Sequence, residues 1–325
     1  MIYLETGSVN PAYNLAFEET VLDRRREGDI LILWQNENTI VVGQNQNTLE
    51  EIDASFAAEH GIRVVRRVTG GGCVYHDLGN LNYSFITDAG APEQLSMAAF
   101  TAPVVAALKG LGLAAEASGR NDILVDGCKV SGTAQCLRGG RVLHHGTLLF
   151  DSNLEVLASA LRADPEKFRS KSSKSVRSRV GNLRPLLRED MDMAAFWAYL
   201  RRYFGAEAAG GLTPEELAEV RQLKAEKYDA WEWTFGRSPR YEVTHRRRWA
   251  GGTLAVSLTV DRGTFEEIAF RGDFLSRKDP TEIEAALRGQ PYRQTEVSAV
   301  LERFFLLDYF GTIGLEEVLR TVFDT

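Results

Sequence analysis

The hydrophobic and polar positions of this chain follow two periods, and the first clear one is helical. Asn10 and Pro11 precede apolar residues that fall on one helical face, and Gly28 follows the last of them. An Asn cap, a Pro in the first turn and a Gly beyond the last turn mark the ends of an amphipathic helix. Similar spacing predicts seven further helices, at residues 94–111, 154–161, 194–204, 214–227, 280–287, 295–304 and 315–322.

Short apolar and β-branched runs predict strands between these helices. The turn-prone residues 36–38 separate runs at 30–35 and 39–43, which we interpret as a hairpin. The glycine pair at 139–140 predicts a tight turn between two later strands. The predicted strands cover residues 30–35, 39–43, 64–67, 80–87, 123–125, 129–137, 141–150, 231–233, 241–244, 253–261 and 265–270.

The order of these elements predicts an α+β protein with two domains. Strands and helices interleave up to about residue 240, whereas the rest of the chain forms strands first and helices afterwards. That ending is long enough for a core of its own. At 325 residues the chain also exceeds the usual size of one domain. We therefore predict one domain over residues 1–244 and a smaller one over residues 245–325.

The composition is that of an ordinary globular protein. The chain is 44% hydrophobic and 26% charged, and its net charge of -7 disfavours binding to bulk nucleic acid. Three cysteines without a CxxC pair argue against a disulfide framework and against a cysteine metal site. No window approaches the roughly 18 apolar residues of a membrane span, and the first residues do not resemble an export signal. We expect a cytoplasmic protein that does not bind membranes.

One segment inverts the overall charge. Residues 162–188 hold nine Lys or Arg residues against two acidic ones, around a serine-rich centre. Such a segment has too few apolar side chains to pack by itself, and binding of an anion would order it. A solvated basic surface is the alternative interpretation.

Three consecutive glycines, at positions 70–72, follow Arg66 and Arg67. Glycine loses more backbone entropy on ordering than any other residue, so this run favours close approach of another group to the backbone. The arginines, together with His76 and Asp77 beyond the run, indicate that this group is an anion. Because a strand follows, the run is neither a dinucleotide-binding GxGxxG nor a P-loop. A plain turn between two strands is the alternative.

A second glycine-containing turn carries further polar groups. Asn121 and Asp122 precede the turn, and Lys129, Ser131 and Gly132 follow it. An amide, a carboxylate, an ammonium and a hydroxyl within one hairpin can hold a phosphate and orient an attacking group. Under the alternative interpretation, Lys129 is a solvated surface residue.

The histidines and cysteines indicate the chemistry of the site less clearly than these motifs do. His144 and His145 are adjacent, so on a strand they face opposite sides and cannot share a metal ion. We expect one of them to point inward. No Ser-His-Asp order or GxSxG elbow supports a hydrolase. Cys73 and Cys128 lie inside the candidate site, where each is either a nucleophile or a small packing residue.

These motifs together resemble the lipoate-protein ligases of the long, two-domain type. The resemblance rests first on RRxxGGGxVxHDxGN at residues 66–80. It continues through GRND at 119–122, KVSG at 129–132, HHGTLL at 144–149, SVRSRVxNL at 175–183 and WEWxFG at 231–236. The motifs occur in the family's order.

The resemblance implies a mixed-sheet catalytic domain of the biotin- and lipoate-protein ligase type, followed by a small accessory domain. It implies an enzyme that uses ATP and Mg²⁺ to join lipoate to AMP with release of pyrophosphate. A lysine amine on a lipoyl domain then takes the lipoyl group. The implied acceptors are 2-oxoacid dehydrogenase E2 subunits and the glycine-cleavage H protein. Neither step needs a nucleophile from the enzyme, and a monomer is the simplest expectation for this architecture.

The resemblance also implies roles for individual residues. Lys129 would contact both the lipoate carboxylate and the α-phosphate, and Asp122 would hold Mg²⁺ or position the incoming lysine. The implied ATP and adenylate site comprises Arg67, Gly72, Cys73, Val74, Tyr75, Asn121, Lys129, Ser175, Val176, Arg177 and Arg179. The implied lipoate site comprises Arg67, Gly71, Gly72, His76, Lys129, Ser131, Gly132 and His145. The basic segment becomes a loop that closes over the reactive adenylate and excludes water.

Two other classes of function stay open on sequence alone. A related octanoyl- or lipoyltransferase would work without ATP through an acyl-cysteine on Cys73, Cys128 or Cys136, and a non-catalytic lipoate-binding module would do neither step. Cys73 stands where a small residue such as alanine is common in the family, so thiol reagents can inhibit without a catalytic thiol. The basic loop and the accessory domain favour the ligase.

Overall fold

The computed structural model describes residues 1–90, 97–118, 121–161, 180–206, 210–237, 241–274 and 277–324. The chain divides into two compact units. The first unit comprises residues 1–44 and 60–230, and the second comprises residues 45–59 and 231–325. Within the described ranges, no helix is long and apolar enough to cross a membrane.

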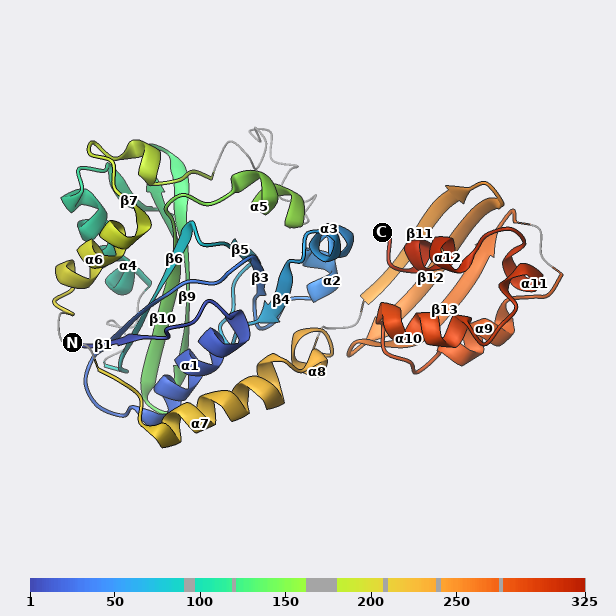
Figure 1. Ribbon diagram of the computed structural model, residues 1–325, viewed down its shortest axis with the longest axis horizontal. Coiled ribbons are helices and arrows are strands. Elements are labelled where there is room, and N and C mark those ends of the chain that lie inside the picture. The colour runs from blue at the N-terminus through green and yellow to red at the C-terminus, as the bar shows by residue number, and fades with distance from the viewer. Residues whose placement is uncertain are drawn as a thin grey trace. The chain divides into compact units, whose positions relative to one another are not determined.

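A mixed sheet of seven strands forms the centre of the first unit (Figure 1). Its strand order is β1-β2-β6-β10-β9-β8-β7. β1 and β2 are parallel, and the other neighbouring strands are antiparallel. The strands are β1 (Ile2–Glu5), β2 (Ile30–Trp34), β6 (Asn80–Asp88), β7 (Ala115–Ser118), β8 (Asp122–Val125), β9 (Cys128–Arg138) and β10 (Arg141–Leu149). The predicted α+β class is confirmed.

Helices cover both faces of this sheet (Figure 1). On one face, Val104 and Leu108 of α4 (Met97–Gly110) and Phe196 and Leu200 of α6 (Met193–Tyr203) are fully buried in the core. The other face carries α1 (Pro11–Arg24), with α7 (Pro214–Leu223) beside it. The remaining helical elements of this unit are α5 (Leu154–Ala160), a 3₁₀ turn (Arg184–Leu186) and a π-helical turn (Lys224–Tyr228).

Helix α1 begins as its sequence predicts. Pro11 is its first residue, and the Asn10 side chain accepts a hydrogen bond from the Tyr13 amide at 3.0 Å. However, the expected single apolar face is wrong, because α1 is buried nearly all round, including Glu18 and Glu19. The cause is its position between the sheet and α7.

A second sheet in this unit has three strands in the order β4-β3-β5. The strands are β3 (Thr39–Val42), β4 (Arg63–Arg66) and β5 (Val74–His76). The predicted hairpin of residues 30–35 and 39–43 is therefore wrong, because β2 and β3 belong to different sheets. The buried Asn36 holds their connection, since its amide contacts Asn14 at 2.9 Å and His76 at 3.1 Å.

The second unit has a core of its own. Three antiparallel strands, β11 (Tyr241–Trp249), β12 (Gly252–Asp261) and β13 (Thr264–Gly272), form its sheet. Val256, Phe270, Phe310 and Leu319 are buried between sheet and helices. The helices are α2 (Thr48–Glu51), α3 (Ala54–Glu59), α8 (Trp231–Thr234), α9 (Thr281–Leu287), α10 (Gln294–Leu301), α11 (Leu306–Phe310) and α12 (Leu315–Val322).

Two details near the start of this unit differ from the sequence-based prediction. Residues 231–233 form α8 and not a strand, because Trp231 stacks on Phe235 one helical turn later, with ring centroids 5.9 Å apart. The predicted division between residues 244 and 245 falls inside β11, which pairs with β12 along its length. The compact units change earlier, between Ala230 and Trp231.

Candidate active site

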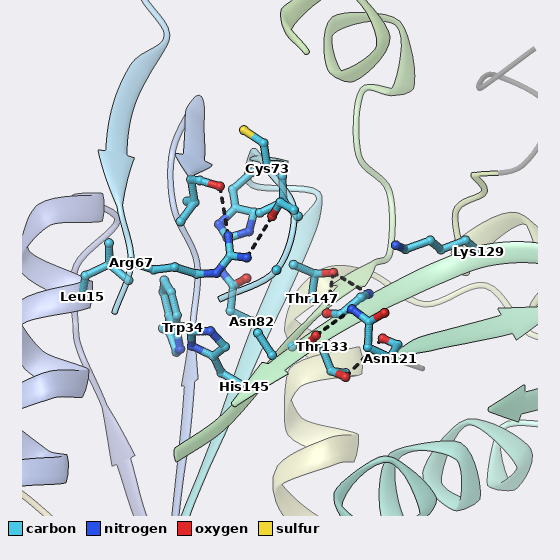
Figure 2. Close-up of a pocket in the computed structure, with 18 residues that line it drawn as sticks. Leu15, Trp34, Arg67, Cys73, Asn82, Asn121, Lys129, Thr133, His145 and Thr147 are labelled. Atoms are coloured by element: carbon cyan, nitrogen blue, oxygen red, sulfur yellow. Dashed lines mark hydrogen bonds between the residues drawn. The ribbon is translucent and has the colours of Figure 1, made fainter. Parts of the chain in front are cut away.

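A cavity of about 100 Å³ lies in the first unit, lined by residues of both sheets and of α1 (Figure 2). Leu15 and Trp34 lie at one end, and Val41 also lines the cavity. Lys129 and Asn121 lie at the other end. The cavity therefore has an apolar end and a polar end.

The glycine loop forms part of the wall, and Arg67 holds it in shape. The Arg67 guanidinium donates to the carbonyls of Gly70 at 2.7 Å, Gly72 at 2.8 Å and Val41 at 3.1 Å, and to the Thr69 hydroxyl at 3.0 Å. Burial lowers the pKa of Arg67 to about 10, so the group stays charged at neutral pH. Arg67 thus stabilises the loop through its carbonyl groups.

Only glycine fits the middle of this loop easily. Gly71 has a φ of 93°, in the left-handed region that residues with a side chain rarely adopt. A Cβ at this position would also lie 3.1 Å from Nη2 of Arg67. Gly71, Gly72, Cys73 and Val74 line the cavity, and the two glycines place no side chain in front of their backbone.

A buried chain of hydrogen bonds stands behind the cavity wall. His145 accepts from, or donates to, the Thr69 hydroxyl through Nε2 at 2.7 Å, and its Nδ1 lies 2.9 Å from the Glu18 carboxylate. The same carboxylate accepts from the Ser84 hydroxyl at 2.5 Å, and Ser84 accepts from the Trp34 indole at 2.9 Å. This relay connects the apolar end of the cavity to Thr69, which also accepts from Arg67, so it fixes the glycine loop from within.

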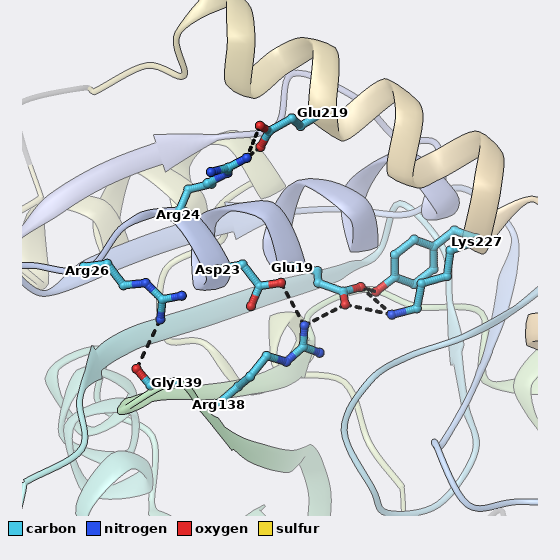
Figure 3. A network of polar contacts seen from close by, with 9 residues as sticks. Glu19, Asp23, Arg24, Arg26, Arg138, Gly139, Glu219 and Lys227 are labelled. Carbon is cyan, nitrogen blue, oxygen red and sulfur yellow. Dashed lines mark hydrogen bonds and ion pairs between the residues drawn. The ribbon is translucent and has the colours of Figure 1, made fainter.

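Glu19, which follows Glu18 in α1, forms a separate cluster with Arg138, Lys227 and Tyr228. We call it the Glu19 cluster (Figure 3). Its carboxylate accepts hydrogen bonds from Lys227 at 2.7 Å, Tyr228 at 2.5 Å and Arg138 at 2.7 Å. Burial would raise the pKa of Glu19, but these hydrogen bonds outweigh burial and the pKa lies below its usual range. The cluster joins α1 to β9 and to the π-helical turn.

Lys129 reaches the cavity across Gly132. Its Nζ lies 2.7 Å from Oδ1 of Asp122, and a Cβ at Gly132 would lie only 3.3 Å from Cε and Nζ of Lys129. Lys129 and Gly132 share a face of β9 although they are three residues apart, because Val130 forms a β-bulge opposite β8. The side chain of Val130 packs into the core, and Lys129 lies over the sheet on the cavity side.

The turn that carries Asn121 is fixed by Thr133. The Asn121 amide donates to the Thr133 carbonyl at 2.9 Å, and its own carbonyl accepts from the Thr133 amide at 2.9 Å and hydroxyl at 3.1 Å. Thr147 accepts from the Gly132 amide at 3.1 Å. Asn121, Lys129 and Gly132 are therefore brought together at one end of the cavity, as the sequence predicts.

The structure brings most, but not all, of the predicted site residues to the cavity. His76, His145, Arg67, Gly71, Gly72, Cys73 and Val74 line it. Ser131 is fully buried on the opposite face of β9, paired with the core residue Ile123. The Tyr75 side chain is directed to Asn38, whose Oδ1 accepts from its hydroxyl at 2.9 Å. Ser175, Val176, Arg177 and Arg179 lie outside the described residues.

The two adjacent histidines face opposite sides of the sheet, as predicted. His145 lines the cavity, whereas His144 stacks on Phe100 with ring centroids 4.9 Å apart. Burial lowers the pKa of His144 to about 3, so its ring is neutral. His144 is a core residue.

The cysteines form no disulfide, and the carboxylates form no metal-binding cluster among the described residues. No disulfide joins Cys73, Cys128 and Cys136, and burial raises the pKa of Cys136 to about 11, which keeps its thiol protonated. Asp122 is paired with Lys129. The described part of the chain holds no group of three or more His, Cys, Asp or Glu side chains that could bind a metal ion.

Sequence reasoning missed several residues of the cavity. Trp34, Asn82 and Thr147 line it, and Glu18 orients His145 from behind. Trp34, Asn82 and Thr147 occupy one row across β2, β6 and β10, which becomes visible only when the strand register is known. No local motif marks Trp34 or Asn82, and Thr147 lies within the HHGTLL motif but received no role there.

Two protein families match successive parts of the chain. Residues 10–205 match the lipoyl protein ligase A/B catalytic domain family. Residues 238–322 match the bacterial lipoate protein ligase C-terminus family. The two matches together cover most of the chain.

Individual relatives agree over nearly the whole length. The lipoate-protein ligase LplJ of Bacillus subtilis is 41% identical, over 99% of this chain and 100% of its own. Lipoate-protein ligase 1 of Staphylococcus aureus is 38% identical, over 96% of both chains. In both comparisons the aligned region includes the two family domains.

Two solved structures superpose on about three quarters of this chain. The bi-partite lipoate protein ligase of Thermoplasma acidophilum superposes with a TM-score of 0.65 and 30% identity, over 73% of this chain and 96% of its own. A lipoate-protein ligase A bound with ATP superposes with a TM-score of 0.63 and 27% identity, over 73% of this chain and 98% of its own. Fold, cavity and sequence together show that this chain belongs to the lipoate-protein ligase family.

Proposed function

We propose that this protein is an ATP-dependent lipoate-protein ligase, which activates lipoate as lipoyl-AMP and passes the lipoyl group to a lysine. The observation that supports this most is the division of the cavity into an apolar end with Leu15 and Trp34 and a polar end with Lys129 and the glycine loop. Lipoate has the same division, with an apolar chain and one charged carboxylate. The related ligase A bound with ATP supports ATP as the second substrate.

In the first half-reaction, a carboxylate oxygen of lipoate attacks the α-phosphorus of ATP, and the bond to pyrophosphate breaks. We assign Lys129 to the carboxylate and α-phosphate, where its positive charge offsets charge that develops in the transition state. The exposed backbone of Gly71, Gly72 and Cys73 is assigned to the phosphate, held by Arg67 from behind. Asn121 is assigned to the same polar end.

In the second half-reaction, a lysine amine of the acceptor attacks the acyl carbon, an amide bond forms and AMP leaves. Asp122 is the carboxylate nearest to Lys129, at 2.7 Å, and we assign it to orient the incoming amine. Neither half-reaction requires an enzyme nucleophile. The imidazoles of the cavity wall, His76 and His145, are assigned to the lipoate side.

Mg²⁺ is the expected companion of ATP, and it supplies positive charge to the phosphates. Mg²⁺ is commonly held by one or two protein carboxylates together with substrate phosphates and water. Asp122 fits that role as a single carboxylate beside Lys129. Residues 175–179, assigned to an adenylate-covering loop by the family resemblance, lie outside the described residues, so their role stays a prediction.

We propose lipoyl domains as acceptors, on 2-oxoacid dehydrogenase E2 subunits and on the glycine-cleavage H protein. The archaeal lipoylation system compared above comprises a bi-partite ligase and its E2 lipoyl domain, which supports the first of these acceptors. A monomeric state and a cytoplasmic location stay predictions.

Lipoate-dependent exchange of labelled pyrophosphate into ATP tests the first half-reaction. We expect exchange by the wild-type protein and a loss of about 100-fold or more in Lys129→Ala, the scale seen when a charge-stabilising group is removed. Lys109→Ala is the matched control, because Lys109 is exposed at the end of α4. Transfer is measured by the mass increase of an unmodified lipoyl domain.

The other function classes give different results in the same experiment. Folded wild-type protein without exchange refutes the ligase. A thioester on Cys73, Cys128 or Cys136 after incubation with an octanoylated carrier would establish the acyltransferase instead. Lipoate binding with neither activity would leave a binding module.

A further inference from the structure

A short part of the chain leaves the first unit and then returns to it. Residues 45–59, which we call the excursion segment, lie between β3 and β4 in sequence but belong to the second unit. Within that unit the Thr48 hydroxyl donates to the Thr234 carbonyl at 2.6 Å, and Leu49 packs against the core. β4 leads into the glycine loop, and β3 pairs with both β4 and β5. The excursion segment therefore begins and ends at the sheet that carries the glycine loop.

The start of the excursion segment is bound to the residues before the glycine loop. The Gln44 amide donates to the Thr69 carbonyl at 2.9 Å. Arg66, which is fully buried, donates through Nη1 to the carbonyls of Gly43 at 2.9 Å and Gln44 at 3.1 Å. A buried guanidinium is tolerated where its donors find acceptors, so these carbonyls are held close to β4. Arg66 lies outside the cavity, so it fixes the backbone and does not bind an anion there.

The end of the excursion segment is bound, through Asn38, to the residues after the glycine loop. A carbonyl can only accept, so the Asn38 atom that lies 2.9 Å from the His60 carbonyl is Nδ2. Oδ1 consequently faces the Tyr75 hydroxyl and accepts from it at 2.9 Å. The backbone carbonyl of Asn38 accepts from the Arg63 amide at 3.0 Å. Asn38 thus joins the returning chain to β5 as well as to β4.

We infer that Asn38 and Arg66 are positioning residues that couple the second unit to the glycine loop through the excursion segment. The inference rests on the proposed function, in which the loop binds the phosphate of ATP. Thr69 and Tyr75, which receive the contacts described above, stand at the two ends of the loop. A shift of either end of the excursion segment is therefore passed to the loop. Packing in the second unit then influences the affinity of the loop for ATP.

Such coupling is reciprocal, because a ligand that favours one position of the loop favours the matching position of the excursion segment by the same free energy. ATP with Mg²⁺ should therefore slow the hydrogen exchange of backbone amides in residues 45–59. Asn38→Gly removes the side chain that ties the returning chain to β5, and glycine keeps the φ of 37° without strain. ATP should slow this exchange less in the variant than in the wild type.

The kinetic test changes the second unit and measures the ATP concentration that gives half-maximal pyrophosphate exchange. Leu49→Ala removes packing of the excursion segment against the core of the second unit. The loop then spends less time in the position that binds ATP, so the apparent affinity for ATP falls. We expect the half-saturating ATP concentration to rise about 3- to 30-fold, the scale of mutational effects on coupling. The half-saturating lipoate concentration and the maximal rate should stay close to those of the wild type.

Leu315→Ala is the matched control. Leu315 of α12 is also partly buried against the core of the second unit, but it lies outside the excursion segment. This variant should leave the ATP requirement close to that of the wild type. Asn38→Gly should raise it, and Leu49→Ala should have a smaller effect in the Asn38→Gly background than alone, because the two changes interrupt the same connection.

The outcomes separate the coupling from the proposed function. Equal ATP requirements in Leu49→Ala and Leu315→Ala, independent effects in the double variant, or hydrogen exchange at residues 45–59 that ATP does not slow would each overturn the coupling, while normal pyrophosphate exchange would still support the ligase. Slowing by ATP that depends on Asn38, in protein without lipoate-dependent pyrophosphate exchange, would support the coupling and refute the ligase.

Thermal melting identifies any variant that is unfolded, and a second variant then replaces it. Thr48→Val, which keeps the side-chain shape and removes the hydroxyl that donates to Thr234, replaces Leu49→Ala. Asn38→Asp, whose carboxylate cannot donate to the His60 carbonyl, replaces Asn38→Gly. The same results are expected of these variants, and the same results would overturn the coupling.

Discussion

Replacing Gly132 by alanine tests how Lys129 is positioned. The added Cβ would lie 3.3 Å from both Cε and Nζ of Lys129 and 3.9 Å from Oδ1 of Asp122. Ordinary carbon contacts begin at about 3.5 Å, so the lysine must move by a few tenths of an ångström. The other neighbours leave room, because the third-nearest atom, Oδ1 of Asp122, is already at an ordinary contact distance.

The expected loss of activity is moderate. A 1 Å misplacement of a catalytic group can cost about 100-fold, so a shift of a few tenths should cost about three- to tenfold in adenylation. Folding should not suffer, because the φ of Gly132 lies outside the left-handed region and alanine fits the strand. Alanine in place of glycine within a strand stabilises by about 0.5–1 kcal/mol. Gly132→Ala should therefore be at least as stable as the wild type and less active.

Two assays decide this prediction. Pyrophosphate exchange measures adenylation, and thermal melting measures stability. The Lys129→Ala background isolates the cause, because Gly132→Ala should have no further effect once the lysine side chain is gone. Gly211→Ala is the matched control, since its Cβ would meet nothing within 4 Å and the residue lies outside the cavity.

An additive loss in the double variant would refute the reasoning, because Gly132 would then act on the substrate and not through Lys129. Unchanged exchange in Gly132→Ala would refute it as well, since the lysine would have absorbed the contact without consequence.

Three further predictions concern stability. His144→Phe should preserve the stacking on Phe100 and remove a pH effect. Because the folded pKa of His144 is about 3, the wild type loses up to about 1.4 kcal/mol of unfolding free energy per pH unit as pH falls below 6.5. In urea titrations at falling pH, the variant should lose less. Glu19→Gln should lower the free energy of unfolding by about 2 kcal/mol at pH 7, and this difference should shrink as pH falls through the lowered pKa of Glu19. A difference below about 0.5 kcal/mol by urea titration, roughly the error of such values, would contradict the prediction. Gly79→Ala should reduce the yield of folded protein, because its Cβ would lie 2.1 Å from the Asp151 carbonyl oxygen, and wild-type melting behaviour would show that this turn adjusts.

Much of the fold follows from local pattern. The N-cap of α1, the strands β6 and β10 and the helix α12 lie close to their predicted positions, because each depends on its own residues. The C-terminal end of α1 does not, since the helix ends at Arg24 and not at Gly28. The Gly139-Gly140 turn also follows, since both residues have positive φ. Which strands pair with one another does not follow from local pattern. For this reason the sequence predicts a hairpin of β2 and β3, although the two strands belong to different sheets.

The candidate site divides along the same line. Lys129, the glycine loop and Asn121 stand in recognisable local motifs, so sequence indicates them. Asn82 and Glu18 reach the site only through strand register and helix packing, and nothing beside them in the chain marks them. Ser131 is the converse case: strict alternation would place it with Lys129, but the bulge at Val130 turns it into the core.

Two consecutive residues of α1 make contacts in two different parts of the first unit. Glu18 orients His145 in the cavity wall, and Glu19 binds the π-helical turn that ends two residues before the first unit does. Because α1 is buried nearly all round, it should not unfold locally at one of these contacts while the other stays intact. The backbone amides of α1 and of Lys224–Tyr228 should therefore exchange with solvent in a single cooperative opening. Filling the cavity would then slow hydrogen exchange in the last turn before the second unit begins.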